Sequence, residues 1–176
     1  MPFLLKADRS HEADGVYIIK DALALEKALK DLNNMERSGS KSFISQELIH
    51  AEGNVLRVVI IGGRAIAYWK RPRNQGQIIT SLGRGAKIDK DWRRDLQKKG
   101  IIKARRLSDV TGINLAAVDF IFPFNLPEPD PLFLEINYYF GRRGLGGSLN
   151  YYSLLFEAVK DWVLERGLDP GSLRLA

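Results

Sequence analysis

The sequence contains no cysteine and only two histidines, His11 and His50. This excludes disulfide bonds, thiolate zinc sites and thiol nucleophiles, and two histidines so far apart do not predict a zinc site. The absence of cysteine suits a reducing compartment, so we predict a cytoplasmic protein. No apolar run approaches the roughly 20 residues that span a bilayer, and the first residues do not resemble a secretory signal. We therefore expect no membrane partner.

The 176 residues are 45% hydrophobic and 27% charged, which is typical of a globular protein. Lys and Arg number 27 against 21 Asp and Glu, a formal charge of +6. This balance favours polyanionic partners, either nucleic acid or the phosphates of a smaller ligand. The cations gather in residues 70–73 and 87–106, whereas residues 127–137 are acidic. Neighbouring segments of opposite charge indicate a phosphate held between cations and metal-binding carboxylates.

The hydrophobic pattern predicts an α+β protein with two lobes around a shared cleft. In the first lobe, the order is strand, strand, helix and strand, and Asp21 is the expected N-cap of the helix. In the second lobe, Gly62 and Gly63 predict a tight hairpin. The other expected elements are a strand at 77–81, a helix over 90–111 that Gly100 interrupts, paired strands at 114–122 and 132–136, and an amphipathic C-terminal helix.

Three oxygen-bearing side chains lie in the two paired strands. Asp119 interrupts an apolar strand, and Glu135 and Asn137, two residues apart, point to the same face of the next strand. A hairpin pairing would bring Asp119 beside them, and such hard oxygen ligands suit Mg²⁺ together with substrate phosphates. The alternative is that Asp119 accepts a buried hydrogen bond and Glu135 ends a strand in water. A charge within an apolar strand is costly unless paired or metal-bound, which favours the metal site.

Seven segments, in this order over nearly the whole chain, resemble the C-terminal part of ATP-grasp ligases. The resemblance is closest to the branch that contains glutathione synthetase and the ribosomal-protein glutamate ligases. The segments are Phe3-Leu4-Leu5-Lys6, Gly15-Val16, Ser45-Gln46-Glu47-Leu48-Ile49, Leu56-Arg57-Val58-Val59-Ile60-Ile61-Gly62-Gly63-Arg64, Thr80-Ser81-Leu82-Gly83-Arg84-Gly85, Ala117-Val118-Asp119 and Leu134-Glu135-Ile136-Asn137.

The resemblance implies an ATP-grasp fold with a nucleotide cleft between a small α+β lobe, residues 1–50, and a larger lobe, residues 51–176. The larger lobe would contain an antiparallel sheet and helices. The implied cofactors are ATP and Mg²⁺ (or Mn²⁺), with the metal on Asp119, Glu135 and Asn137. The implied nucleotide-binding positions are Lys6 and Gly15 at the phosphates, Gln46, Glu47, Leu48 and Ile49 at the adenine, and Ser81 and Arg84 in a loop under the phosphates.

The implied reaction is phosphorylation of a carboxylate by ATP, followed by attack of an amine or a thiol on the acyl phosphate. Lys70 is placed to face the γ-phosphate, and Arg142 and Arg143 are placed to hold the carboxylate or the acyl phosphate. The alternative for each of these cations is a solvated position at a strand end or in a glycine-rich loop.

The resemblance begins at the strand of Lys6, so we expect a preceding substrate-binding domain to be missing and this chain alone to be inactive. The expected partners are a nucleotide, a carboxylate substrate and that N-terminal domain. Two alternatives remain open: a nucleic-acid-binding module that uses the cations of residues 87–106, and a catalytically silent ATP-grasp scaffold. A charge run is more often a solvated face. The presence of all three expected metal ligands disfavours a silent scaffold.

Overall fold

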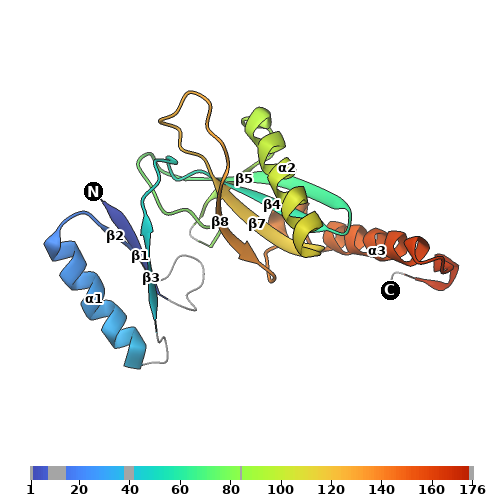
Figure 1. Cartoon of the computed structure of the whole chain (residues 1–176), viewed down its shortest axis with the longest axis horizontal. Coiled ribbons are helices and arrows are strands. Elements are labelled where there is room, and N and C mark those ends of the chain that lie inside the picture. Colours follow the sequence, from blue (N-terminus) through green and yellow to red (C-terminus); the bar gives the residue numbers. More distant parts are fainter. Residues whose placement is uncertain (1, 8–14, 38–41, 84, 175–176) are drawn as a thin grey trace.

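A computed structural model of the chain describes residues 2–7, 15–37, 42–83 and 85–174. Arg84, one of the predicted nucleotide-binding residues, lies outside these residues. Two antiparallel sheets follow one another along the chain, a three-stranded sheet and a five-stranded sheet (Figure 1). This arrangement has the predicted α+β character. None of the helices in the described part of the chain is long and apolar enough to cross a bilayer.

The three-stranded sheet carries one helix, on the face away from the five-stranded sheet (Figure 1). Its elements are β1 (Phe3–Ala7), β2 (Val16–Ile19), α1 (Ala22–Arg37) and β3 (Phe43–Glu47), with β1 in the centre. The helix begins where predicted, since the Ala24 N–H donates to Asp21 Oδ1 at 2.8 Å. Ala28 and Leu32 of the helix pack with Leu5 and Ile19 of the strands. The predicted division of the chain at residue 50 falls between β3 and β4 and stays a prediction.

The five-stranded sheet has the order β6-β5-β4-β7-β8, and all neighbouring strands are antiparallel. The strands are β4 (Val55–Ile61), β5 (Arg64–Arg71), β6 (Lys87–Asp89), β7 (Leu115–Ile121) and β8 (Leu132–Asn137). The hairpin at Gly62 and Gly63 and the pairing of β7 with β8 are both as the sequence predicts.

The predicted strand at 77–81 is wrong, because this segment packs as a loop against the turn before β4. The Gln77 side chain donates to the Ile79 carbonyl, and Thr80 is buried. A Cβ on Gly53 would lie 2.0 Å from the Gln77 carbonyl oxygen, so the turn and the loop are in direct contact. The edge of the sheet is formed instead by β6, a strand of only three residues.

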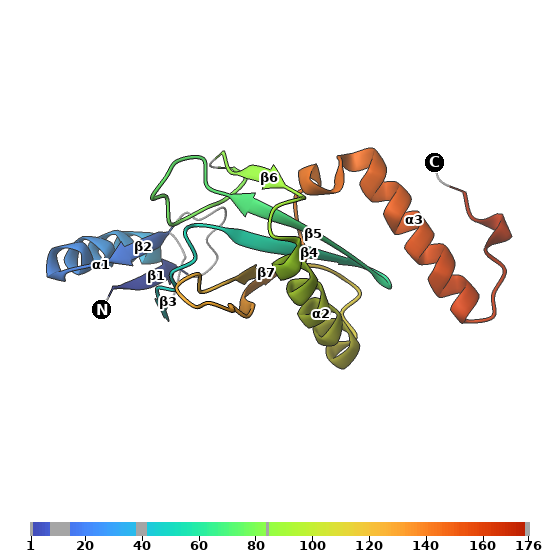
Figure 2. The same ribbon diagram turned by 90° about the horizontal axis from the view of Figure 1, so that it is seen from above.

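Two long helices, α2 (Arg94–Thr111) and α3 (Ser148–Glu165), pack on opposite faces of this sheet (Figure 2). Leu56, Val58 and Ile60 of β4 face α2. Val59 and Ile61 face α3, together with the short turn η1 (Arg143–Leu145). A second short turn, η2 (Pro170–Ser172), follows α3. Because side chains alternate along a strand, Arg57 lies on the α3 face.

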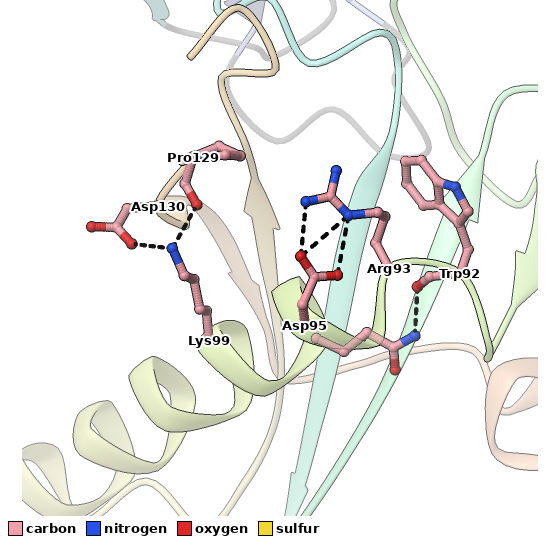
Figure 3. Close-up of polar contacts among 7 residues, drawn as sticks. Trp92, Arg93, Asp95, Lys99, Pro129 and Asp130 are labelled. Atoms are coloured by element: carbon pink, nitrogen blue, oxygen red, sulfur yellow. Dashed lines mark hydrogen bonds and ion pairs between the residues drawn. The ribbon is translucent and has the colours of Figure 1, made fainter. Parts of the chain in front are cut away.

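Gly100 does not interrupt α2, so this prediction is wrong. The helix is continuous, and a Cβ on Gly100 would lie 2.4 Å from Leu56 Cδ2. The glycine therefore permits close packing of helix on sheet. One residue earlier, Lys99 Nζ contacts the Pro129 carbonyl oxygen and Asp130 Oδ1, both at 3.2 Å (Figure 3). This contact fixes the proline-rich loop between β7 and β8 to the helix.

Candidate functional site

A row of polar side chains crosses the α3 face of the five-stranded sheet. Tyr68 of β5 pairs in register with Arg57 of β4, Arg57 with Asp119 of β7, and Asp119 with Glu135 of β8. Cross-strand partners project from the same face, so the four side chains are neighbours. The register of β7 and β8 shifts directly after Asp119, which is a β-bulge. Such bulges redirect side chains and are frequent beside active sites.

Asp119 is the most deeply buried member of the row and is held by two cations. Its exposed fraction is 0%, against 9% for Arg57 and 6% for Lys70. Arg57 Nε donates to Oδ1, and Arg57 Nη2 donates to Oδ2, each at 2.7 Å. Lys70 Nζ donates to the same Oδ2, also at 2.7 Å. The charge within the apolar strand is therefore compensated by two partners.

The pKa values in the row follow from these contacts. Burial alone would raise the pKa of the Asp119 carboxyl, but Lys70 and Arg57 outweigh burial and hold this pKa below its ordinary value. Burial alone would lower the pKa of Arg57, but its hydrogen bonds to Asp119 raise it. Asp119 is thus a carboxylate at neutral pH, and both of its neighbours carry a positive charge.

The three predicted metal ligands lie on the two neighbouring strands β7 and β8. Glu135 is the register partner of Asp119, and the Asn137 side-chain amide donates to Glu135 Oε1 at 3.1 Å. Their donor chemistry fits Mg²⁺, which takes carboxylate and amide oxygens and keeps room for phosphates. In the part of the chain that the structure describes, no three His, Cys, Asp or Glu residues form a metal cluster. A metal here would therefore need the amide of Asn137 or the oxygens of a ligand.

The three-stranded sheet also contributes a side chain near this row, Lys6. It lies on β1, and burial lowers its pKa, while the nearby Glu135 carboxylate partly offsets the shift. Lys70, by contrast, is bound to Asp119, as described above. Its neighbour Arg71 points to the other face, where it pairs with Asp89 and lies over the Trp92 ring. Only Lys70 of this pair can act on a ligand at the polar row.

The predicted nucleotide-binding residues lie on three segments. The Gly15 carbonyl accepts from the Ala7 N–H at 2.9 Å, which joins the residue before β2 to the end of β1. The Ser81 carbonyl accepts from the Ala86 N–H at 3.1 Å. The predicted adenine segment comprises Gln46 and Glu47, the last residues of β3, and Leu48 and Ile49 after them. These positions stay predictions.

The two predicted catalytic arginines have different surroundings. The Arg142 guanidinium lies over the Tyr151 and Tyr152 rings, with centroids at 4.7 and 4.6 Å, and donates to the Tyr152 hydroxyl. Arg143 is exposed and donates to the Leu82 carbonyl at 3.2 Å. It therefore joins the loop before α3 to the predicted phosphate loop.

Sequence reasoning assigned no role to Arg57 or to Tyr68. Arg57 is a cation within an apolar strand, as Asp119 is an anion within one, and two such opposite interruptions predict a buried pair. For Tyr68 the sequence gives no comparable indication. Its ring closely contacts Gly144, where a Cβ would lie 2.1 Å from the ring. Burial raises the pKa of its hydroxyl, and the nearby Arg57 acts in the opposite direction.

A shallow hollow of about 240 Å³ lies elsewhere, at the far end of β4. It is lined by the hairpin and by α2, with Arg64, Arg105 and Asp109 among its residues. This hollow does not include any residue of the polar row. The chemistry of the row, and not this hollow, identifies the candidate site.

Comparisons with known proteins identify the family to which the chain is similar. A family model described as the RimK-like ATP-grasp domain matches residues 1–148. A probable alpha-L-glutamate ligase 2 of Hahella chejuensis is 28% identical over 150 residues, covering 85% of this chain and 46% of that protein. A probable alpha-L-glutamate ligase of Parasynechococcus marenigrum is 27% identical over 145 residues, covering 82% of this chain and 29% of that protein. The chain thus spans less than half the length of these relatives.

Solved structures show the same fold at low identity. A D-alanine–D-alanine ligase from Bacillus anthracis superposes with a TM-score of 0.63 at 14% identity, covering 94% of this chain and 55% of that chain. A RimK domain ATP-grasp protein from Sphaerobacter thermophilus superposes with a TM-score of 0.53 at 15% identity, covering 88% and 52%. These similarities confirm the predicted ATP-grasp architecture.

Proposed function

Because the chain belongs to the RimK-like ATP-grasp family, we propose that it is the ATP- and metal-binding part of a ligase that joins a carboxylate to an amine or a thiol. The polar row carries this proposal. It places the carboxylates of Asp119 and Glu135 among the cations of Arg57, Lys70 and Lys6. Cations favour a polyphosphate, and the carboxylates and Asn137 favour the divalent ion that accompanies it. A catalytically silent scaffold would need neither the cations that favour a polyphosphate nor the oxygen ligands that favour a metal ion.

The proposed reaction has two steps. A substrate carboxylate attacks the γ-phosphorus of ATP, which gives an acyl phosphate and ADP. An amine or a thiol then attacks the acyl carbon, and inorganic phosphate leaves. When bound by Asp119, Glu135 and Asn137, Mg²⁺ would neutralise phosphate charge.

The side chains of this chain have separate roles in the proposal. Lys6 and Lys70 bind phosphate oxygens from two directions, one from each sheet. Arg143, beside the loop that contains Ser81 and Leu82, stabilises the negative charge of the substrate carboxylate or the acyl phosphate. Arg142 belongs to the same short loop, and its ring contacts with Tyr151 and Tyr152 fix its direction. Residues 46–49 bind the adenine through their backbone.

The relatives are named as probable glutamate ligases, so glutamate is the first amine to test. We also propose that residues 1–50 and 51–176 form the two lobes around the nucleotide, and that the protein acts in the cytoplasm.

The alternative function, a nucleic-acid-binding module, has less support. Several cations near and on α2 are paired, such as Arg93 with Asp95 and Lys99 with Asp130 (Figure 3). The helix also covers the face of the sheet opposite to the polar row.

Isothermal titration calorimetry with ADP, with and without Mg²⁺, tests the proposed function. We expect the chain to bind Mg²⁺–ADP and Glu135→Gln to weaken this binding by roughly tenfold or more, since a charged metal ligand is lost. The matched control is Glu165→Gln, an exposed residue at the end of α3, which should leave the affinity unchanged. A folded chain that binds no nucleotide under either condition would disprove the proposal.

A further inference from the structure

Both carboxylate oxygens of Asp119 accept hydrogen bonds from cations. Arg57 donates to Oδ1 and Oδ2, and Lys70 donates to Oδ2, all at 2.7 Å. An ionised carboxylate has about four acceptor positions, so three are occupied. The oxygen that both cations share is therefore not free to bind a metal ion.

The electrostatic surroundings also disfavour a metal ion that arrives alone. Lys6, Arg57 and Lys70 act on this part of the sheet against two carboxylates, Asp119 and Glu135. Arg143 adds another positive charge near Tyr68. The site is thus net positive among the described residues. A divalent cation is repelled by such a site, whereas a polyphosphate is attracted and reverses the local charge.

The two partners of Asp119 differ in how easily they can leave. Arg57 lies in the middle of β4 and holds the carboxylate with a planar two-point contact. Lys70 is the last residue but one of β5 and holds it through a single ammonium on a flexible stem. The flexible stem of a lysine lets its three donors turn to a phosphate, whereas the Arg57 fork is held in its two-point contact with Asp119.

We propose that Lys70 makes metal binding at Asp119 depend on the nucleotide. In the nucleotide-free chain, the Lys70 ammonium occupies Oδ2 of Asp119 and excludes the metal from this oxygen, while its charge and that of Arg57 repel a metal ion from the rest of the carboxylate. When a nucleotide binds, its phosphate takes the ammonium, and Oδ2 becomes available. This inference rests on the proposed function and adds an order of loading to it. Because such coupling is reciprocal, the metal also strengthens nucleotide binding once Lys70 has moved.

Two separate titrations of the full chain test this order, Mn²⁺ alone followed by electron paramagnetic resonance, and metal-free ADP followed by calorimetry. In wild type we expect metal-free ADP to bind and Mn²⁺ alone to show no saturable binding at millimolar concentration. In Lys70→Met, Mn²⁺ alone should bind about tenfold more tightly or better, while metal-free ADP binds about tenfold more weakly. A merely structural lysine would weaken both ligands together, so the opposite directions distinguish the proposal.

Lys70→Arg and Lys98→Met are the matched variants. Lys70→Arg keeps the charge on Asp119, so Mn²⁺ alone should still fail to bind. Lys98 is exposed on α2, on the other face of the sheet, and its change to Met should affect neither titration. Circular dichroism checks that each variant is folded.

Three results would overturn the inference. They are saturable binding of Mn²⁺ alone to wild type, the same metal affinity in Lys70→Met as in wild type, and parallel weakening of both ligands. If Lys70→Met does not fold, the wild-type and Lys70→Arg titrations decide. Failure of the proposed function looks different, because then ADP does not bind to wild type at all, while the Mn²⁺ comparison between wild type and Lys70→Met remains readable.

Discussion

At the scale of single residues, Asp119 determines the character of the site. Its neighbours on β7 are fully or almost fully buried and apolar, from Ala116 to Phe120. An unpaired carboxylate in such a strand would be strongly destabilising, and Arg57 and Lys70 compensate it. The same residue is the proposed metal ligand. One carboxylate thus links the stability of the sheet to the binding of ligands.

We expect Asp119→Asn to lower the free energy of unfolding at pH 7 by about 3 kcal/mol, since two buried cations lose their counter-charge. The folded-state pKa of Asp119 lies below its unfolded value near 3.8. Its contribution is therefore complete above the unfolded pKa and is lost as the pH falls through the folded pKa. Chemical denaturation at several pH values should show the gap between wild type and variant narrowing below about pH 4.

The matched control for this prediction is Asp109→Asn, an exposed aspartate of α2. It should change the free energy of unfolding by no more than about 0.5 kcal/mol at any of these pH values. Equal stability of Asp119→Asn and wild type at pH 7 would contradict the structural role given to the buried ion pairs.

The sequence predicts part of this site. An acid in the apolar run of residues 116–122 and the spacing of Glu135 and Asn137 predict a cluster on paired strands, and the register confirms that Asp119 lies beside Glu135. The sequence does not predict that Lys70 binds Asp119. Lys70 lies on β5 and Asp119 on β7. The two side chains meet because both strands pair with β4, which lies between them. Such contacts between residues 49 positions apart depend on tertiary structure.

At the scale of secondary-structure elements, local patterns predict the strands that alternate or pair through tight turns. The hairpin at Gly62 and Gly63 is one example. Residues 77–81 contain Ile78 and Ile79 and look like a strand, but they form a loop that packs closely against the turn at Gly53. The three-residue strand β6 has too few residues for a periodic pattern. The low helix propensity of glycine predicts that Gly100 interrupts α2. The helix is continuous instead, because Gly100 allows it to pack closely against Leu56.

Gly100→Ala tests this packing. Helix propensity alone would make the change stabilising by about 1 kcal/mol. We expect destabilisation by about 1–2 kcal/mol instead, because the new Cβ meets the fully buried Leu56 side chain. Thermal or chemical denaturation measures the difference.

The double variant Gly100→Ala with Leu56→Ala shows whether this contact is the cause. Its loss of stability should be clearly smaller than the sum of the two single losses, because the added methyl group fills part of the space that Leu56 leaves. Additive losses, or a stabilising Gly100→Ala, would show that the helix and β4 are not as closely packed as described.

At the scale of the whole molecule, two sheets supply the proposed site together. The three-stranded sheet contributes Lys6, and the five-stranded sheet contributes Lys70, Asp119 and Glu135. The loop before α3 joins the predicted phosphate loop through Arg143 and Leu82. A nucleotide bound here would contact both sheets and would therefore stabilise their relative arrangement.

Lys6→Met tests the contribution of the first sheet. We expect ADP affinity to fall roughly 10- to 100-fold, the usual effect of one hydrogen bond to a charged group. The melting temperature without nucleotide should change little, because burial already disfavours the charged lysine. Lys20→Met, an exposed lysine just after β2, is the matched control and should leave the affinity unchanged. Equal affinities for Lys6→Met and wild type would remove β1 from the site.

Anomalous diffraction from crystals of the chain grown with Mn²⁺ and ADP tests the central claim most directly, namely that the paired strands β7 and β8 hold a divalent metal beside the nucleotide. The account predicts one strong peak within coordination distance of oxygens of Asp119, Glu135 and Asn137, with Lys70 turned from Asp119 to a phosphate. A nucleotide bound with its metal elsewhere, with Lys70 still on Asp119, would contradict it.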